Sequence, residues 1–337
     1  MKATIWRNAA TAGAFSLAAF CGLASAQVAE PTDAAPTNGN VIPGTEDNFD
    51  PVYNVCRGTD PRCYHNWVDD RENRVLIYSR TAGPRHANLG PALPAGLNPP
   101  LTDSHTVQKA LIAWLNAEGV EVDWTEDVTR LSSLNKYKAV IFASPTRDTL
   151  WKHGTAVSPT SAVNTTTNAH LDAAKTALRQ YMRAGGGFVG FHNAFGTEYN
   201  WPYYEGLLGN ANYYDHGANQ DGDVVIVSKD ASTEGLPQRF PFRDEWYNLV
   251  PFPTNVKFLA TVDENTLATR RSTHPGHGSF HPVTWCQYYD GGRSWVTTLG
   301  HDRGAFTDGS GFPGQAEFKK MLVNGILSAM GNKPFCK

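Results

Sequence analysis

Short apolar runs alternate with amphipathic helical segments through the middle of the chain, and no other feature restricts the fold as much. Residues 74–79, 120–124, 138–143 and 188–191 are expected strands, whereas residues 103–118 and 167–184 have the spacing of helices. Strands that alternate with helices form parallel sheets covered on both faces. The pattern therefore predicts an α/β fold with a doubly wound, mostly parallel sheet, which binds its ligands at the carboxyl ends of the strands.

Beyond residue 220 the pattern changes to strands separated by turns. These strands are expected at residues 224–227, 256–260, 281–285 and 294–298, before a last helix at 315–330. We expect them to continue the same sheet and to add a C-terminal β extension. Because no internal repeat or linker interrupts this part of the chain, residues 73–337 are predicted to form one domain.

The N-terminal residues differ in kind from the rest. Lys2 and Arg7 precede an apolar run over residues 9–23, which closes on small residues at 24–26. This is the pattern of a cleaved signal peptide over residues 1–26, and its apolar run is too short to span a bilayer. Residues 27–72 are expected to form a flexible lead with a small disulfide loop. The sequence thus predicts a secreted or periplasmic protein without a membrane span.

Four cysteines remain after removal of the predicted signal peptide, namely Cys56, Cys63, Cys286 and Cys336. An even number suits disulfides in an oxidising compartment, and three pairings are possible. The short separation favours Cys56–Cys63, which leaves Cys286–Cys336 to hold the C-terminus on the body. A zinc cluster is the competing interpretation, but the chain has no C-x-x-C pair.

The charge balance argues against nucleic acid as a partner. The chain has 29 Lys and Arg against 32 Asp and Glu, a formal net charge of -3, and no basic block that could follow a phosphate backbone. The phosphate-binding glycine motifs of nucleotide-binding folds are also missing from the sequence.

Histidines border several expected strands and are the first candidates for a functional site. His192 directly follows one strand, His281 opens another, and His301 follows a third, while His216 lies in a tyrosine-rich segment. Imidazoles that converge at a sheet edge offer metal ligands or general acid and base groups. We therefore take His192, His281 and His301 as candidate ligands of a divalent metal. For each ring alone, the competing interpretation is a half-buried histidine satisfied by a backbone carbonyl.

Asp244 and Glu245 are the carboxylates best suited to catalysis. Phe242, Trp246 and Tyr247 flank this pair. Apolar surroundings disfavour the charged form and raise the pKa of a carboxyl group towards that of a useful acid or base.

The segment after His192 is rich in aromatic and amide side chains. Flat apolar faces interleaved with hydrogen-bonding groups suit a sugar ring, so this segment is expected to form the wall of a pocket. The candidate sugar contacts are Asn193, Glu198, Tyr199 and Trp201, with His216 further along the chain. Ordinary packing of a long loop is the competing interpretation.

Residues 190–194 have the frame of a nucleophile elbow, but His192 stands where hydrolases and amidotransferases carry Ser or Cys. An imidazole does not form the usual acyl-enzyme. A Ser or Cys hydrolase and a glutaminase are therefore poor interpretations of this chain.

Five stretches carry a resemblance to a known family: residues 75–86 (VLIYSRTAGPRH), 142–150 (FASPTRDTL), 185–216, 244–248 (DEWYN) and 281–301. In order and spacing they resemble the trehalose-utilisation (ThuA-like) proteins. The resemblance implies a flavodoxin-like, class I glutamine-amidotransferase-like fold without the amidotransferase cysteine. It also implies a role in carbohydrate catabolism, notably of oxidised 3-keto-glycosides.

The resemblance also points to particular pocket residues. Carried over residue by residue, it implies His192, Asp244, Glu245, His281 and His301, with His86 and Asp148 as neighbours. An insertion at residues 88–101 departs from the family pattern, so either His86 or His105 holds the family position. A second insertion is expected at residues 151–164.

Together these observations predict an exported protein that cleaves glycosidic bonds in sugars or 3-keto-sugar derivatives. A 3-keto group acidifies the neighbouring C–H, so Glu245 or His192 would remove that proton and the glycosidic oxygen would leave. His301 or a divalent cation would polarise the ketone, and Asp244 completes the catalytic set. The alternative is a non-catalytic carbohydrate-binding module on the same fold.

Overall fold

The computed structural model describes residues 49–50, 55–58, 71–151, 173–269 and 273–337. These residues all belong to one unit of the chain, residues 42–337. The predicted signal peptide, most of the predicted lead, Cys63 of the expected disulfide loop, and the start of the helix expected at 167–184 lie outside the described residues.

The first half of the sheet is parallel, as the alternating pattern predicts. Its strands are β3 (Glu72–Tyr78), β4 (Glu121–Thr125), β5 (Tyr137–Ala143), β6 (Gly187–Phe191) and β11 (Gly292–Thr297). They lie in the order β4-β3-β5-β6-β11, and every neighbouring pair is parallel. The connections run through α1 (Thr106–Ala117), the 3-10 helix η4 (Val128–Lys136) and α2 (Ala173–Arg183).

The second half of the sheet is antiparallel. It consists of β10 (His281–Tyr289), β9 (Lys257–Asp263), β7 (Tyr213–Ile226) and β8 (Arg239–Leu249), in that order outward from β11. The short strands β1 (Phe49–Asp50) and β2 (Val55–Gly58) branch off at β10.

The expectation of a mostly parallel, doubly wound sheet was therefore wrong, because the sheet is mixed. The later strands do continue the same sheet, but hairpins join them where a parallel sheet would need crossover helices. Between β10 and β11, Asp290 has φ 49° and Gly291 has φ 92°, the left-handed geometry of a tight hairpin turn.

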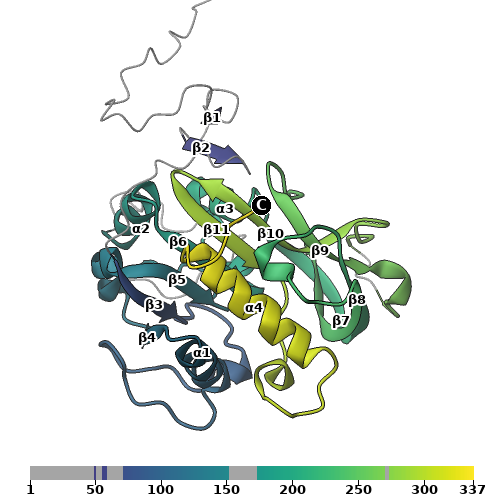
Figure 1. The fold of residues 1–337 in the computed structure, drawn as a ribbon, viewed down its shortest axis with the longest axis horizontal. Coiled ribbons are helices and arrows are strands. Elements are labelled where there is room, and N and C mark those ends of the chain that lie inside the picture. Colours follow the sequence, from purple (N-terminus) through teal and green to yellow (C-terminus); the bar gives the residue numbers. More distant parts are fainter. Residues whose placement is uncertain (1–48, 51–54, 59–70, 152–172, 270–272) are drawn as a thin grey trace, which may run out of the picture. The chain divides into compact units, whose positions relative to one another are not determined.

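Helices cover both faces of the sheet, as predicted. α1 and α4 (Gln315–Ala329) pack in one apolar core, and α2 and α3 (Pro202–Leu207) pack in the other. In Figure 1, α4 crosses in front of the sheet. Gly325 permits this close approach, since a Cβ at this position would lie 2.4 Å from the Trp295 ring.

The predicted disulfide between Cys286 and Cys336 is confirmed and ties β10 to the C-terminal tail. Among the described residues, no helix combines the length and apolar character needed to cross a bilayer.

Candidate functional site

His192 occupies the sharp bend where β6 ends and the 3-10 helix η6 (His192–Gly196) begins. Its φ of 49° lies in the left-handed region, which costs free energy for a residue with a Cβ and is typical of functional positions. The ring is fully buried. Its Nδ1 lies 3.1 Å from the carbonyl oxygen of Thr298. A carbonyl can only accept, so Nδ1 carries the hydrogen and Nε2 presents its lone pair.

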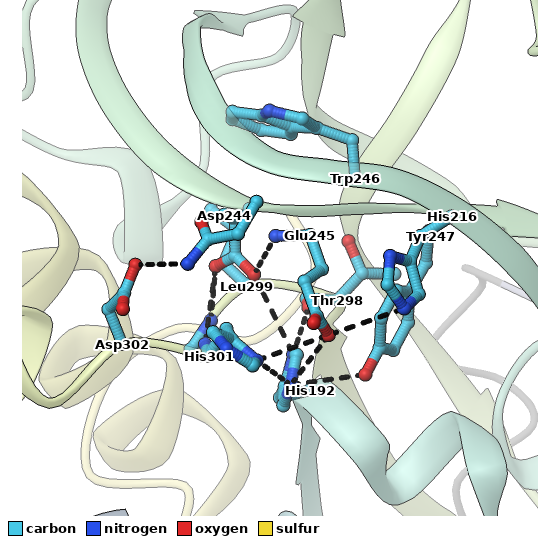
Figure 2. Close-up of polar contacts among 12 residues, drawn as sticks. His192, His216, Asp244, Glu245, Trp246, Tyr247, Thr298, Leu299, His301 and Asp302 are labelled. Atoms are coloured by element: carbon cyan, nitrogen blue, oxygen red, sulfur yellow. Dashed lines mark hydrogen bonds and ion pairs between the residues drawn. The ribbon is translucent and has the colours of Figure 1, made fainter. Parts of the chain in front are cut away.

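Four side chains surround this lone pair, and Figure 2 shows three of them, those of His301, Glu245 and Tyr247. From His192 Nε2, the distance is 3.0 Å to Nε2 of His86 and 3.3 Å to Nδ1 of His301. It is 3.9 Å to Oε2 of Glu245 and 3.1 Å to the hydroxyl of Tyr247. The three histidines follow β3, β6 and β11, whereas Glu245 and Tyr247 belong to β8. Segments far apart in the sequence thus meet at one point.

The three imidazoles and Glu245 form a donor set that fits a divalent cation; we call these four residues the donor cluster. One ligand atom from each lies within 4.8 Å of all the others. Ligand bonds of about 2.0–2.2 Å put neighbouring donor atoms roughly 3–3.5 Å apart. The distances from His192 to His86 and His301, 3.0 and 3.3 Å, agree with this spacing. So does the 3.1 Å between His301 Nδ1 and Glu245 Oε2. Nitrogen-rich sets of this kind suit zinc and neighbouring transition metals.

Electrostatics keeps two of the imidazoles neutral. Burial lowers the pKa of His86 to about 4, and the charge of His301 acts in the same direction. Burial also holds the pKa of His192 well below its usual value. Metal binding requires unprotonated nitrogen, so these two rings are ready to serve as ligands at neutral pH.

His301 and Glu245 behave differently because they pair with each other. Burial alone would lower the pKa of His301, but the hydrogen bond and charge of Glu245 outweigh it and raise that pKa. Burial alone would raise the pKa of Glu245, but His301 outweighs it and lowers that pKa. The rise in carboxyl pKa that the sequence predicts for this pair occurs at Asp244 instead. Burial raises the pKa of Asp244 to about 7, although the hydrogen bond from the Gly300 amide acts in the opposite direction.

Strand alternation decides which β8 side chains reach the donor cluster. Glu245 and Tyr247 point toward His192, whereas Trp246 between them points to the other side of the strand (Figure 2). Asp244 lies behind the cluster, where its carboxylate accepts hydrogen bonds from the amides of Glu245 and Gly300. Asp244 is therefore suited to holding the backbone around the cluster.

His216 on β7 is the most suitable proton acceptor beside the donor cluster. Its Nδ1 donates to the carbonyl oxygen of Gly217 at 2.5 Å, so Nε2 presents a lone pair. Nε2 lies 3.6 Å from Glu245 Oε2. The side chain is 28% exposed, while that of His192 is fully buried. His216 is thus open to both the cluster and solvent.

We expect the zinc affinity of this site to fall as the pH drops below neutrality. Glu245 raises the pKa of His301, so the ring is protonated at mildly acidic pH and must release that proton to bind metal. Below that pKa, affinity should decrease about tenfold per pH unit. Calorimetric titration with Zn²⁺ at pH 5.5, 6.5 and 7.5 measures the effect. A flat profile over this range would show that His301 is not a ligand.

His281 lies outside the donor cluster, although it was a candidate ligand. Its Nδ1 lies 2.7 Å from Glu264 Oε1, and its Nε2 lies 2.9 Å from the carbonyl oxygen of Tyr247. Both ring nitrogens therefore have hydrogen-bond partners, and the ring contacts the backbone of β8. His105 is likewise satisfied, by the amide of Thr102 and the carbonyl oxygen of Pro91. Of the two rings between which the sequence left the choice open, His86 is the one that joins the cluster.

The other expected sugar contacts have mixed surroundings. Glu198 is buried and pairs with Lys175 at 2.8 Å. The Trp201 ring stacks on Tyr203, 5.3 Å between centroids. Asp148 is buried, and Asn193 and Tyr199 are half-buried. The Tyr199 hydroxyl donates to the carbonyl oxygen of Tyr213, which lies beside the cluster.

Sequence reasoning missed two groups that contact the histidines. Tyr247 was considered only as an apolar neighbour, yet its hydroxyl reaches His192. Ser144 has its hydroxyl 3.3 Å from Nδ1 of His86 and adopts a left-handed φ of 48° after β5. The period-2 spacing from Glu245 could have identified Tyr247. No sequence pattern indicates the role of Ser144.

Comparison with known proteins supports both the fold and the family. A family model described as trehalose utilisation (ThuA) matches residues 74–329, in agreement with the resemblance seen in the sequence. A ThuA-like protein from Parabacteroides merdae ATCC 43184 is 16% identical, with a TM-score of 0.51 over 77% of this chain and 90% of that chain. A ThuA-like protein from Bacteroides uniformis ATCC 8492 is 19% identical, with a TM-score of 0.49 over 77% and 92%. No curated protein matches the chain.

Proposed function

The chain belongs to the trehalose utilisation (ThuA) family, and from this premise we propose that it is an exported enzyme that cleaves glycosidic bonds in 3-keto-sugar derivatives. The observation that carries the proposal is the donor cluster with His216 beside it. Three of these side chains are partly exposed, His216 by 28%, His301 by 26% and Glu245 by 16%, so a ligand can reach them. A module that only binds sugar needs no such set of groups.

The chemistry follows from the ketone. A carbonyl at C3 of a sugar acidifies the proton on C2, because the carbanion left behind is delocalised onto the carbonyl oxygen. When that electron pair returns to form a C1–C2 double bond, the C1–O bond breaks and the glycosidic oxygen leaves with its electrons. The leaving oxygen then takes a proton and departs as an alcohol. Addition of water to the double bond completes net hydrolysis.

Each step has a suitable group in the site. His216 Nε2 offers the lone pair that accepts the C2 proton, and the same imidazolium can then protonate the leaving oxygen. Burial raises the pKa of Tyr247 far above its usual value, so its hydroxyl stays protonated and can donate to the carbonyl oxygen as charge develops there. A divalent cation held by His86, His192, His301 and Glu245 would supply Lewis acidity at that oxygen.

This assignment changes two roles expected from the sequence. Glu245 and His192 were the candidate bases, but both face the centre of the donor cluster, where they serve better as ligands. The base is then the more exposed His216.

The test is turnover of a 3-keto-glycoside by the purified protein. We expect zinc-loaded protein to release the aglycone from 3-keto-trehalose, observed by NMR, and to leave trehalose unchanged. His216→Gln should lower the rate by about 10²–10⁴-fold with little change in zinc affinity, because the base does not hold the metal. Binding of the keto-sugar without turnover would favour the binding-module alternative, and neither binding nor turnover would reject both.

A further inference from the structure

Arg147 is a half-buried cation, and none of the acidic residues that the structure describes forms an ion pair with it. Among the arginines of residues 71–151, 173–269 and 273–337, three have a side chain that makes no hydrogen bond or ion pair with another described residue: Arg147, Arg179 and Arg303. Arg179 and Arg303 are exposed, so water satisfies them, whereas Arg147 is only partly accessible. Removing a charge from water costs free energy unless a partner compensates. This partly accessible side chain is therefore suited to pair with an external anion.

The backbone holds Arg147 at the same sheet edge as the donor cluster. The residue follows β5 with a left-handed φ of 58°. Its amide donates to the carbonyl oxygen of Gly196, and its carbonyl oxygen accepts from the amide of Glu198, both at 3.0 Å. Its side chain passes Gly83, where a Cβ would lie 2.4 Å from Arg147 Cγ. Arg147 thus lies between the segment that leads to His86 and the segment that begins at His192.

A chain of contacts through three tyrosines connects the guanidinium with the donor cluster. Arg147 lies over the ring of Tyr199, 5.9 Å from its centroid. The Tyr199 hydroxyl donates to the carbonyl oxygen of Tyr213 at 3.1 Å. The Tyr213 ring packs 4.5 Å from that of Tyr247, whose hydroxyl contacts His192. A continuous chain of contacts therefore links the cation to the cluster.

We propose that Arg147 binds the anionic group of the substrate, so that the substrate class is an acidic sugar carrying a carboxylate or a phosphate. This inference rests on the proposed function, because it concerns the same site. The planar guanidinium matches two oxygens of either group through paired hydrogen bonds. Asp148 is the adjacent acid, and burial raises its pKa although the charges of Lys175 and Arg147 act in the opposite direction.

The test measures sugar binding by calorimetry with zinc-loaded protein and sugars that do not react. The ligands are glucuronate, glucose 6-phosphate, glucose and glucuronamide, the last being a neutral isostere of glucuronate. We expect at least one anionic sugar to bind about 10- to 100-fold more tightly than both neutral sugars, with a preference that weakens in salt. Comparison of glucuronate with glucose 6-phosphate identifies which anion the site takes.

Arg147→Gln should abolish this preference while glucose affinity, zinc affinity and melting temperature stay the same. Arg147→Lys should retain part of the preference for anionic sugars, because lysine keeps the positive charge but lacks the paired donors of the guanidinium. Arg239→Gln is the matched control, since Arg239 is an exposed arginine paired with Asp223 and Asp263, and it should bind as the parent does.

Equal affinity for anionic and neutral sugars, no sugar binding at all, or a preference that survives Arg147→Gln would each overturn the inference. The outcome is separable from that of the proposed function. Anion preference without turnover of keto-glycosides would reject the reaction and keep the role of Arg147. Turnover of neutral keto-glycosides without anion preference would keep the proposed reaction and reject the role of Arg147.

Discussion

His192→Ala is expected to remove zinc binding at micromolar concentrations and to lower turnover of a 3-keto-glycoside on the order of 10³-fold or more. His192 Nε2 is the atom around which the other donors gather, and Thr298 fixes its lone pair toward them. Loss of a group that merely orients a ligand costs about 10- to 100-fold in metal affinity, so loss of the central ligand should cost more. Calorimetry with Zn²⁺ and a turnover assay measure the two effects.

The control for this variant is another buried histidine. His105 is 2% exposed and has both nitrogens occupied, but it lies outside the donor cluster. His105→Ala should therefore lower stability without changing zinc stoichiometry. Ala at position 192 keeps a Cβ in the left-handed conformation, so the backbone cost is unchanged and the loss reflects the ring. Zinc binding of parental strength in His192→Ala would refute the metal site.

Lys175→Met is expected to destabilise the protein by about 3–5 kcal/mol at pH 8, because it leaves the buried carboxylate of Glu198 without its partner. Nζ of Lys175 lies 2.8 Å from Glu198 Oε2, and the two side chains are 9% and 0% exposed. Burial raises the pKa of Glu198 above its usual value. The folded variant therefore binds a proton more tightly than the unfolded chain, and the loss should shrink as the pH falls to 5.

Urea unfolding at pH 8 and pH 5 measures both parts of this expectation. The double variant Lys175→Met/Glu198→Gln should recover most of the lost stability, because a neutral amide replaces the stranded charge. Lys109→Met is the matched control, since Lys109 pairs with a fully exposed Asp103 and its loss should leave stability almost unchanged. A loss that is equal at both pH values would point to packing and away from charge.

The elements that sequence analysis located are those whose pattern is local. The strands and helices from β3 to β6, the four later strands it expected, and α4 all appear near their expected residues. β8 was missed, although exposed and buried residues alternate along its first half. Pro241 interrupts the apolar pattern, and β8 tolerates it because this strand lies at the end of the sheet order.

Direction and pairing were harder to predict than strand positions. A strand's own residues do not say whether its neighbour is parallel, so the mixed sheet was not foreseen. The Asp290-Gly291 pair, a dipeptide favoured in two-residue hairpin turns, is a local indication of the hairpin between β10 and β11. In the site, His192 and His301 were found because each directly follows a strand. His281 lies outside the donor cluster because its ring contacts Glu264 and the carbonyl oxygen of Tyr247, and no spacing in the sequence reveals these contacts.

The two halves of the sheet meet at β11, which is parallel to β6 and antiparallel to β10. The donor cluster straddles this seam, with His86 and His192 from the parallel half and Glu245 from the antiparallel half. A cation bound by residues from both halves would cross-link the parallel and antiparallel parts of the sheet. Metal binding should therefore increase the cooperativity of unfolding. We expect the two halves of the sheet to open to hydrogen exchange together in the metal-bound protein, and more independently in the metal-free protein.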